Sequence, residues 1–353
     1  KRVLITGHTG FKGSWLSHVL LLWGAKVSGV ALAPVTKPNL FGILKIKPRV
    51  SNYFTDVRDL KKIKAILKKE KPEIVFHLAA QPIVRVSYDN PIDTFQTNII
   101  GTANVLEAMR SIGGVRSGVI ITTDKVYKNK ETGVAYKEDD MLGGHDPYGS
   151  SKAAAELVVD SYAKSFFNPA NYRKARGTLI ASARAGNVIG GGDWAKDRIM
   201  TDIVRSAFES KKALVVRSPD AIRPWQYVLE PLAGYLTLAR GLYEGRVELS
   251  GAWNFGPQKK GHLRVEDLLL KTFKHLGRGS YVIDRDLTKH EATLLKLDSS
   301  KANQGLSWRS FIQADDALKL TLDWYKNYYD GGDILKLTNQ QIKEFFKRYA
   351  NSM

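Results

Sequence analysis

The fold is decided near the start of the chain, by the stretch Val3-Leu4-Ile5-Thr6-Gly7-His8-Thr9-Gly10-Phe11-Lys12-Gly13. Its apolar run predicts a strand, its Gly-x-x-Gly-x-x-Gly spacing predicts a tight turn, and Trp15–Trp23 predicts a helix. Such glycines let backbone N–H groups approach a pyrophosphate, and a helix N-terminus adds partial positive charge. The stretch therefore predicts a dinucleotide-binding turn, and the alternative is an ordinary glycine-rich turn. The expected contacts come from Gly7, Thr9, Gly10, Phe11, Lys12 and Gly13.

The same alternation of strand and helix continues beyond this turn. Further strands are predicted at Lys26–Leu32, Ser51–Thr55, Glu73–Leu78, Gly118–Thr122 and Leu179–Ala185. Helices are predicted at Asp59–Lys69, Ile92–Ser111, Ser151–Phe166, Val265–Leu276, Asp315–Tyr329 and Gln341–Tyr349. The pattern indicates an α/β protein with a Rossmann-type doubly wound parallel sheet and a smaller C-terminal α/β substrate domain. We expect residues 1–185 and 225–254 in the first domain, and 186–224 and 255–353 in the second.

Composition excludes several classes of protein. The 353 residues contain no cysteine, which excludes disulfide scaffolds and thiolate metal sites. The net charge of +19 suits nucleic acid, an anionic membrane or a phosphate-bearing substrate. The basic residues are scattered without interleaved aromatics, and no apolar stretch reaches the about 18 residues of a membrane span. We therefore expect a cytoplasmic protein without nucleic-acid or membrane partners, and a few residues missing before Lys1. No metal site is predicted, since the seven histidines show no ligand spacing.

The preference between NAD and NADP is left open by the second strand. A carboxylate commonly ends this strand and binds the adenosine ribose, but the chain reads Ala31-Leu32-Ala33-Pro34 here. Asp56, which follows the strand Ser51–Thr55, is a candidate for binding the adenine amino group.

Two motifs carry the expected chemistry. Tyr148 and Lys152 are spaced by one helical turn and share a helix face. An ammonium beside a phenol favours the phenolate, which can take a proton from a hydroxyl. Thr123, Asp124 and Lys125 follow the strand Gly118–Thr122, at the sheet edge where open α/β folds bind ligands. Taken singly, each motif could equally belong to a solvated surface.

The glycine-rich turn, the strand-end Thr123 and Tyr-x-x-x-Lys, in this order, resemble the extended short-chain dehydrogenase/reductase superfamily. Longer blocks resemble the nucleotide-sugar 4,6-dehydratases of this superfamily, and among them the CDP-glucose-specific group. These blocks are Gly7–Ser17, Ala79-Ala80-Gln81-Pro82, Phe166-Phe167-Asn168-Pro169, Ala185–Trp194 and Arg223-Pro224-Trp225-Gln226.

The resemblance implies an NAD-dependent hydro-lyase acting on CDP-glucose. Bound NAD would oxidise C4, water would leave across C5–C6, and the hydride would return to C6, giving CDP-4-keto-6-deoxy-D-glucose. Tyr148 would deprotonate the 4-hydroxyl, Lys152 would lower the pKa of Tyr148 and contact the nicotinamide ribose, and Thr123 would hydrogen-bond the 4-oxygen. Lys125 would be the base at C5 and Asp124 the acid for the 6-hydroxyl, and both need shifted pKa values.

The resemblance also implies the remaining contacts. Further cofactor contacts are expected at Val57, Ala79, Ala80, Gln81 and Asn98. Substrate contacts are expected at Asn187, Trp194, Arg198, Arg223 and Glu291 in the second, nucleotide-sugar-binding domain, and at Tyr227. The helices Ile92–Ser111 and Ser151–Phe166 would pair across a homodimer, or within a tetramer, although burial inside one subunit leaves the same pattern.

Three alternatives stay open at this point. Another nucleotide-sugar 4,6-dehydratase would share every motif, because the cytosine assignment rests on resemblance. A 4-epimerase or net reductase would need Thr123, Tyr148 and Lys152 without the pair Asp124 and Lys125. A non-catalytic dinucleotide-binding protein would not need the intact Tyr-x-x-x-Lys motif.

Overall fold

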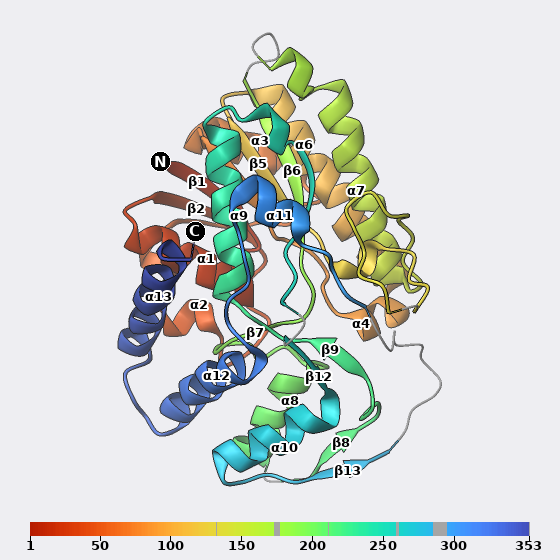
Figure 1. Ribbon diagram of the computed structural model, residues 1–353. Coiled ribbons are helices and arrows are strands. Elements are labelled where there is room, and N and C mark those ends of the chain that lie inside the picture. The colour runs from red at the N-terminus through yellow and green to blue at the C-terminus, as the bar shows by residue number, and fades with distance from the viewer. Residues whose placement is uncertain (132, 173–176, 211, 259–260, 285–294, 353) are drawn as a thin grey trace.

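The centre of the protein is a parallel sheet of seven strands in the order β11-β6-β5-β4-β1-β2-β3 (Figure 1). The computed structural model describes residues 1–353 except 132, 173–176, 211, 259–260, 285–294 and 353. The strands are β1 (Arg2–Thr6), β2 (Lys26–Ala31), β3 (Ser51–Phe54), β4 (Ile74–His77), β5 (Ser117–Ile121), β6 (Leu179–Arg184) and β11 (Gly251–Asn254). The prediction of a Rossmann-type doubly wound sheet is confirmed.

Alternate residues of each strand feed two separate cores. Val3 and Ile5 of β1 pack into one core with Trp15, while Leu4 between them packs into another core with Leu67. Successive strand side chains point to opposite faces, so each strand carries apolar residues on both sides. One face is covered by α1 (Phe11–Leu22) and α9 (Leu229–Tyr243), and the other by α3 (Leu60–Glu70), α6 (Gly101–Ile112) and α7 (Pro147–Ser165).

Helix boundaries differ from the predicted ones where a capping side chain decides them. The helix expected at Ser151–Phe166 begins earlier, at Pro147, because the Asp146 carboxylate accepts a hydrogen bond from the Gly149 amide. Tyr148 therefore lies in the first turn of α7. The helix expected at Ile92–Ser111 is three segments: α5 (Pro91–Phe95), a π-helical turn η2 (Gln96–Ile100) and α6. The helix expected at Gln341–Tyr349 begins at Ile334 as α13 (Ile334–Ala350), where Asp333 caps it.

A smaller group of elements lies below the sheet in Figure 1. It contains α8 (Ile199–Arg205), β8 (Leu214–Val216), β9 (Ile222–Pro224), β12 (His262–Arg264), α10 (Val265–Leu276) and β13 (Tyr281–Ile283). Here β12 pairs antiparallel with β9, and β13 pairs parallel with β8. After β9 the chain returns to the main sheet: β7 (Val188–Ile189) pairs with β10 (Gln226–Tyr227), and further along the chain β11 pairs with β6. The assignment of residues to two domains stays a prediction.

The remaining elements frame this core. They are α2 (Leu40–Ile43), η1 (Lys47–Arg49), α4 (Val84–Asp89), η3 (Asp124–Val126), η4 (Pro169–Asn171), η5 (Ser206–Ser210), η6 (Val247–Leu249), α11 (Ser300–Leu306) and α12 (Ala314–Tyr329). The C-terminal α13 packs on α1, where the His18 ring meets the Asn339 amide oxygen at 2.7 Å. Within the part of the chain that the structure describes, no helix has the length and apolarity needed to cross a membrane.

Candidate active site

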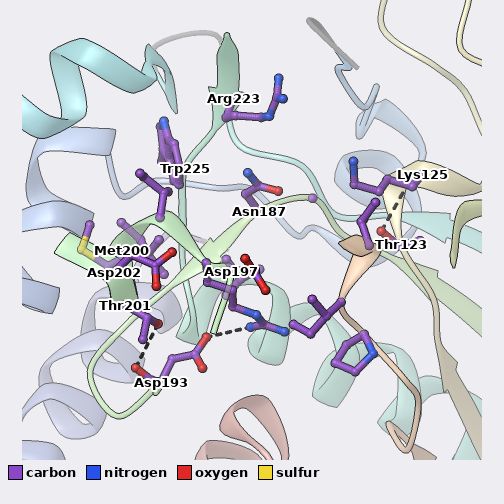
Figure 2. Close-up of a pocket in the computed structure, with 18 of the residues that line it drawn as sticks. Thr123, Lys125, Asn187, Asp193, Asp197, Met200, Thr201, Asp202, Arg223 and Trp225 are labelled. Carbon is purple, nitrogen blue, oxygen red and sulfur yellow. Dashed lines mark hydrogen bonds and ion pairs between the residues drawn. The ribbon is translucent and has the colours of Figure 1, made fainter. Parts of the chain in front are cut away.

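A cavity of about 370 Å³ opens at the carboxyl ends of the sheet strands, above the smaller group of elements. Its walls include Thr123, Asp124 and Lys125 from the end of β5 and Tyr148 from α7. Figure 2 shows Thr123 and Lys125 on one side of this cavity, Asn187 in the middle, and Met200, Asp202 and Trp225 on the other side. The cavity therefore has a catalytic end and a far end.

At the catalytic end, Thr123 links two predicted catalytic side chains. It directly follows β5 and caps η3, where its hydroxyl accepts a hydrogen bond from the Lys125 amide at 3.4 Å. The same hydroxyl donates to Asp124 Oδ1 at 2.9 Å, and its interaction with the Tyr148 phenol lowers the pKa of that phenol. The end of β5 and the first turn of α7 thus bring Thr123 and Asp124 close to Tyr148. Asp124 and Tyr148 are 24 positions apart along the chain.

Burial acts on the acidity of both Tyr148 and Lys152. Burial raises the pKa of the Tyr148 phenol to about 12, although the hydrogen bond with Thr123 lowers it. The Lys152 ammonium donates to the Ile121 carbonyl oxygen at 3.1 Å, and burial lowers the pKa of Lys152 to about 8. The expected lowering of the Tyr148 pKa by Lys152 stays a prediction, because the Lys152 ammonium donates to the Ile121 carbonyl oxygen in this arrangement.

Asp124 has the properties of an acid. Its side chain is buried, and burial raises the pKa of its carboxyl above the ordinary value, while Lys125, Thr123 and Arg223 oppose this rise. A glycine makes room for it, since a Cβ at Gly186 would lie 2.9 Å from Asp124 Oδ2. Asp124 therefore retains its proton at a higher pH than an exposed aspartate does.

The buried ion pair of Glu156 and Arg184, which the sequence did not predict, lies near Lys152. The Glu156 carboxylate accepts hydrogen bonds from Thr122 at 2.5 Å, Ser182 at 2.6 Å, and Arg184 Nε and Nη2 at 2.9 and 3.0 Å. The negative charge of Glu156 acts against the burial that lowers the pKa of Lys152. The only sequence signal was spacing, because residues 148, 152 and 156 recur on one face of α7.

The glycine-rich turn has the geometry of a phosphate cradle. A Cβ at Gly13 would lie 2.1 Å from the Gly7 carbonyl oxygen, and Gly7 itself has φ +75°. Gly10 is the N-cap residue of α1. Because glycine has no side chain, it does not cap the amides of the first helical turn. Thr9 donates its hydroxyl to the Leu32 carbonyl at 3.0 Å and ties the turn to the end of β2. This arrangement fits a dinucleotide diphosphate.

Phe11 and Lys12 lie where the turn meets the cavity, and both line its wall. Burial, together with the positive charges of Arg198 and Lys152, lowers the pKa of Lys12 to about 8. Lys12 is therefore one of several cations that surround the cavity.

The other expected cofactor residues lie along the strand ends beside this turn. Asn98 donates to the Gln81 carbonyl at 3.1 Å and to Ser151 at 2.8 Å, and accepts from the Gln81 amide at 2.8 Å, so it fixes the loop after β4. In that loop the Ala79 amide donates to the Thr6 hydroxyl at 3.1 Å. The neighbouring Ala80 is half-buried, and Val57 is buried in the core beneath α3 and α6.

Asp56 is engaged by a charged neighbour. Its Oδ2 accepts hydrogen bonds from Arg58 Nε at 2.9 Å and Arg58 Nη2 at 2.6 Å, and Arg58 holds the pKa of Asp56 below its usual range. The predicted contact with adenine stays a prediction, and Arg58 competes for the same carboxylate.

Three of the expected substrate residues meet at the cavity and two do not. Asn187, Arg198 and Arg223 line it, and Arg198 donates to the Asp193 carboxylate at 2.7 Å. The expectation for Trp194 is wrong: its ring is buried against Trp324, Tyr325 and Tyr328 of α12.

The expectation for Tyr227 is wrong for a similar reason. Tyr227 is buried, and its hydroxyl donates to Gln341 of α13 at 3.1 Å. Both aromatic side chains are covered by C-terminal helices more than 100 residues further along the chain. Glu291 lies outside the described residues. Among the described residues, no three His, Asp or Glu side chains are grouped to hold a metal ion.

Comparison with known proteins places these observations in a family. A model of the family described as GDP-mannose 4,6 dehydratase matches residues 4–321. A CDP-glucose 4,6-dehydratase of Salmonella typhimurium is 46% identical over 346 residues, covering 98% of this chain and 96% of the relative.

Solved structures share the fold. The UDP-glucose 4-epimerase of Thermotoga maritima, solved with UDP-glucose, superposes with a TM-score of 0.79 at 21% identity, covering 93% of this chain and 99% of that one. The UDP-glucuronic acid 4-epimerase of Bacillus cereus, solved with UDP-glucuronic acid and NAD, has a TM-score of 0.79 at 22% identity, covering 93% of this chain and all of that one.

Proposed function

The chain belongs to the GDP-mannose 4,6-dehydratase family, and we propose that it converts CDP-D-glucose into CDP-4-keto-6-deoxy-D-glucose with NAD as cofactor. The observation that carries the reaction type is the pair Asp124 and Lys125 directly beside Thr123 and Tyr148 at one end of the cavity. Oxidation at C4 needs only Thr123, Tyr148 and Lys152. Removal of water across C5–C6 needs an additional acid and base, and this pair supplies both.

The residues of the turn fit NAD. Gly7, Gly10 and Gly13 leave space for a diphosphate against the backbone, and the first turn of α1 presents its amides to that space. Lys152 would contact the nicotinamide ribose from α7. When bound, NAD accepts hydride from C4 of the sugar and returns it to C6.

The chain's own groups move the protons. Tyr148 would take the proton of the 4-hydroxyl as a phenolate, which requires a nearby positive charge to offset the burial that raises its pKa. Thr123 hydrogen-bonds the 4-oxygen as it becomes a ketone. The ketone acidifies the C5–H bond, and Lys125 takes that proton. Asp124 donates its proton to the 6-oxygen, so that the C6–O bond breaks and water leaves. Lys125 then returns its proton to C5. The raised pKa of Asp124 supports its role, because an acid must be protonated to act.

The diphosphate of the substrate would lie in the middle of the cavity. Asn187 and Arg223 line this part (Figure 2), and Arg198 also lines the cavity. Guanidinium groups bind phosphate oxygens through paired hydrogen bonds, which fixes the sugar nucleotide relative to Tyr148.

The test is incubation of the protein with CDP-glucose, dTDP-glucose, UDP-glucose or GDP-mannose, with and without added NAD, followed by mass spectrometry. A product lighter by one water from CDP-glucose is expected, with the other nucleotides turned over more slowly. A product of unchanged mass would overturn the dehydration in favour of a 4-epimerase, and bulk accumulation of reduced cofactor would indicate a net oxidation.

The base is tested with Lys125→Met, using Lys128→Met as the matched control on the same loop, where Lys128 is exposed. Loss of general base catalysis should lower kcat by about 10²- to 10⁴-fold and stop exchange of the C5 proton with deuterated solvent. Lys128→Met should retain both. Turnover of Lys125→Met at the unmutated rate contradicts the assignment of Lys125.

We propose a homodimer built from the α5, η2 and α7 surface, in the cytoplasm. Ile92 and Leu157 on this surface are 67% and 61% exposed, and Ile100 and Phe166 are also exposed. Large apolar side chains gathered on neighbouring helices favour a contact with a second copy. Leu157→Glu should convert the dimer to a monomer in sedimentation analysis, and an unchanged sedimentation coefficient would contradict this interface.

A further inference from the structure

The far end of the cavity differs in chemistry from the catalytic end. Met200, Val216 and Trp225 line it with buried apolar surface. In Figure 2, Met200, Trp225 and Asp202 lie across the cavity from Thr123 and Lys125, with Asn187 between them. Because the sugar must reach Tyr148 and the diphosphate must reach the cations, the flat apolar base of the nucleotide is left for this end.

Asp202 lies beside these apolar side chains and near other charged ones, including Asp197 and Arg217. Within the described parts of the chain its carboxylate has no hydrogen bond and no ion pair within 4.0 Å, although it lines the cavity. The neighbouring Asp197, by contrast, has Arg217 at 3.9 Å. Burial and the charge of Asp197 raise the pKa of Asp202 to about 6, while Arg205 and Arg217 oppose the rise. Asp202 is half-buried on the cavity wall and accepts no side-chain hydrogen bond from the described residues, so its carboxylate is available to a ligand that brings a donor.

We propose that Asp202 accepts a hydrogen bond from the exocyclic amino group of cytosine, and that this contact selects cytidine nucleotides over uridine and thymidine nucleotides. The inference rests on the proposed function, which supplies a nucleotide sugar at this cavity. Cytosine carries an amino group at C4, whereas uracil and thymine carry a carbonyl oxygen there. The carboxylate thus attracts one pyrimidine and repels the lone pairs of the other two, which gives discrimination by both attraction and repulsion.

The position of the carboxylate argues for a contact with the base. A carboxylate beside the diphosphate would repel it, and the diphosphate has Asn187 and Arg223 at the middle of the cavity. An acceptor that faces position 4 of the base needs a donor at that position, because the N3–H of uracil and thymine lies at a different point on the base edge. The cytosine amino group is such a donor.

Binding of the nucleotides alone tests this without turnover. Isothermal titration calorimetry would give the dissociation constants of CDP and UDP for the unmutated protein and for Asp202→Asn. The amide can donate to the uracil carbonyl, so the ratio of the UDP and CDP constants should fall by about 10- to 100-fold. The matched control is Asp197→Asn, which changes a cavity carboxylate that already has Arg217 beside it. It should leave the ratio within about twofold of the unmutated value, since it changes no contact to the base.

A ligand variant covers the case in which Asp202→Asn does not fold. Pyrimidin-2-one riboside diphosphate lacks only the 4-amino group of CDP, and it should bind the unmutated protein about 10-fold or more weakly than CDP. An unchanged ratio in Asp202→Asn, a changed ratio in Asp197→Asn, or equal binding of CDP and the pyrimidinone would each overturn the role of Asp202. If the unmutated protein does not prefer CDP to UDP, the proposed substrate itself fails, which is a separate outcome.

Discussion

Replacing Lys152 by Met tests whether the catalytic lysine destabilises the folded protein. Lys152 is 4% exposed, and burial lowers its pKa from 10.5 to about 8. The unfolded chain therefore holds more protons than the folded protein between pH 8 and 10.5, and the free energy of unfolding rises with pH across this window. Below pH 8 the buried ammonium costs its full amount, about 3 kcal/mol at about 1.4 kcal/mol for each pKa unit.

The substitution removes the charge and retains most of the side-chain volume. It also removes the hydrogen bond to the Ile121 carbonyl, which contributes about 1 kcal/mol. Lys152→Met should therefore stabilise the protein by about 2 kcal/mol at pH 7. At pH 9.5 the folded lysine has lost its proton and only the cost of deprotonating the unfolded lysine remains, so the total cost falls by about 2 kcal/mol and the variant and the unmutated protein should be nearly equal in stability.

The measurement is urea unfolding at pH 7 and pH 9.5, followed by the fluorescence of the seven tryptophans and at one protein concentration. Lys61→Met, which changes an exposed lysine of α3, is the control and should shift the free energy of unfolding by less than about 0.5 kcal/mol at both pH values. A variant that is less stable at pH 7, or a stability difference that does not change with pH, would refute the reasoning. Lys152→Met should also lose turnover, which separates stability from activity.

Three further substitutions have defined expectations. Glu156→Gln leaves the Arg184 guanidinium buried without its counter-charge, so urea unfolding should show a loss of about 3–5 kcal/mol, partly recovered when Arg184→Met is added; full stability of the single variant would contradict this. Gly13→Ala places a Cβ 2.1 Å from the Gly7 carbonyl, so calorimetry should detect NAD binding at least about 10-fold weaker, and unchanged affinity would exclude the turn as the cofactor site. Gly186→Ala places a Cβ 2.9 Å from Asp124 Oδ2, so kcat should fall by about 100-fold while KM for CDP-glucose changes little; an unaltered kcat would remove Asp124 from the reaction.

The sequence predicts those parts of the fold that are determined locally. The strand, turn and helix at residues 2–22 follow from glycine spacing and apolar runs, and the structure places them as β1 and α1. Helix ends are less well predicted, because a single capping side chain moves them. Asp146 brings the start of α7 back to Pro147, and with it Tyr148 enters the helix.

The sequence predicts less well where the outcome depends on distant packing. Trp194 and Tyr227 have the residue type expected of a nucleotide-binding wall, but α12 and α13 cover them. No residue close to Trp194 or Tyr227 in the sequence predicts their contacts with these two helices. Likewise, motif spacing identifies Tyr148 and Lys152 as neighbours, but it does not indicate how much water they lose on folding. Desolvation depends on the whole surroundings, and it decides the sign of the Tyr148 pKa shift.

The cations of the cavity link stability to binding. Lys12, Lys152 and Arg198 are close enough that the positive charges of Arg198 and Lys152 lower the pKa of Lys12. Holding like charges together in a buried cavity costs free energy, and a diphosphate brings the negative charge that offsets it. The same groups that destabilise the protein alone are therefore those that favour the ligand. A substitution that stabilises the fold by removing one of these cations must weaken diphosphate binding, whereas the overall charge of +19, which is spread over the surface, has no such coupling.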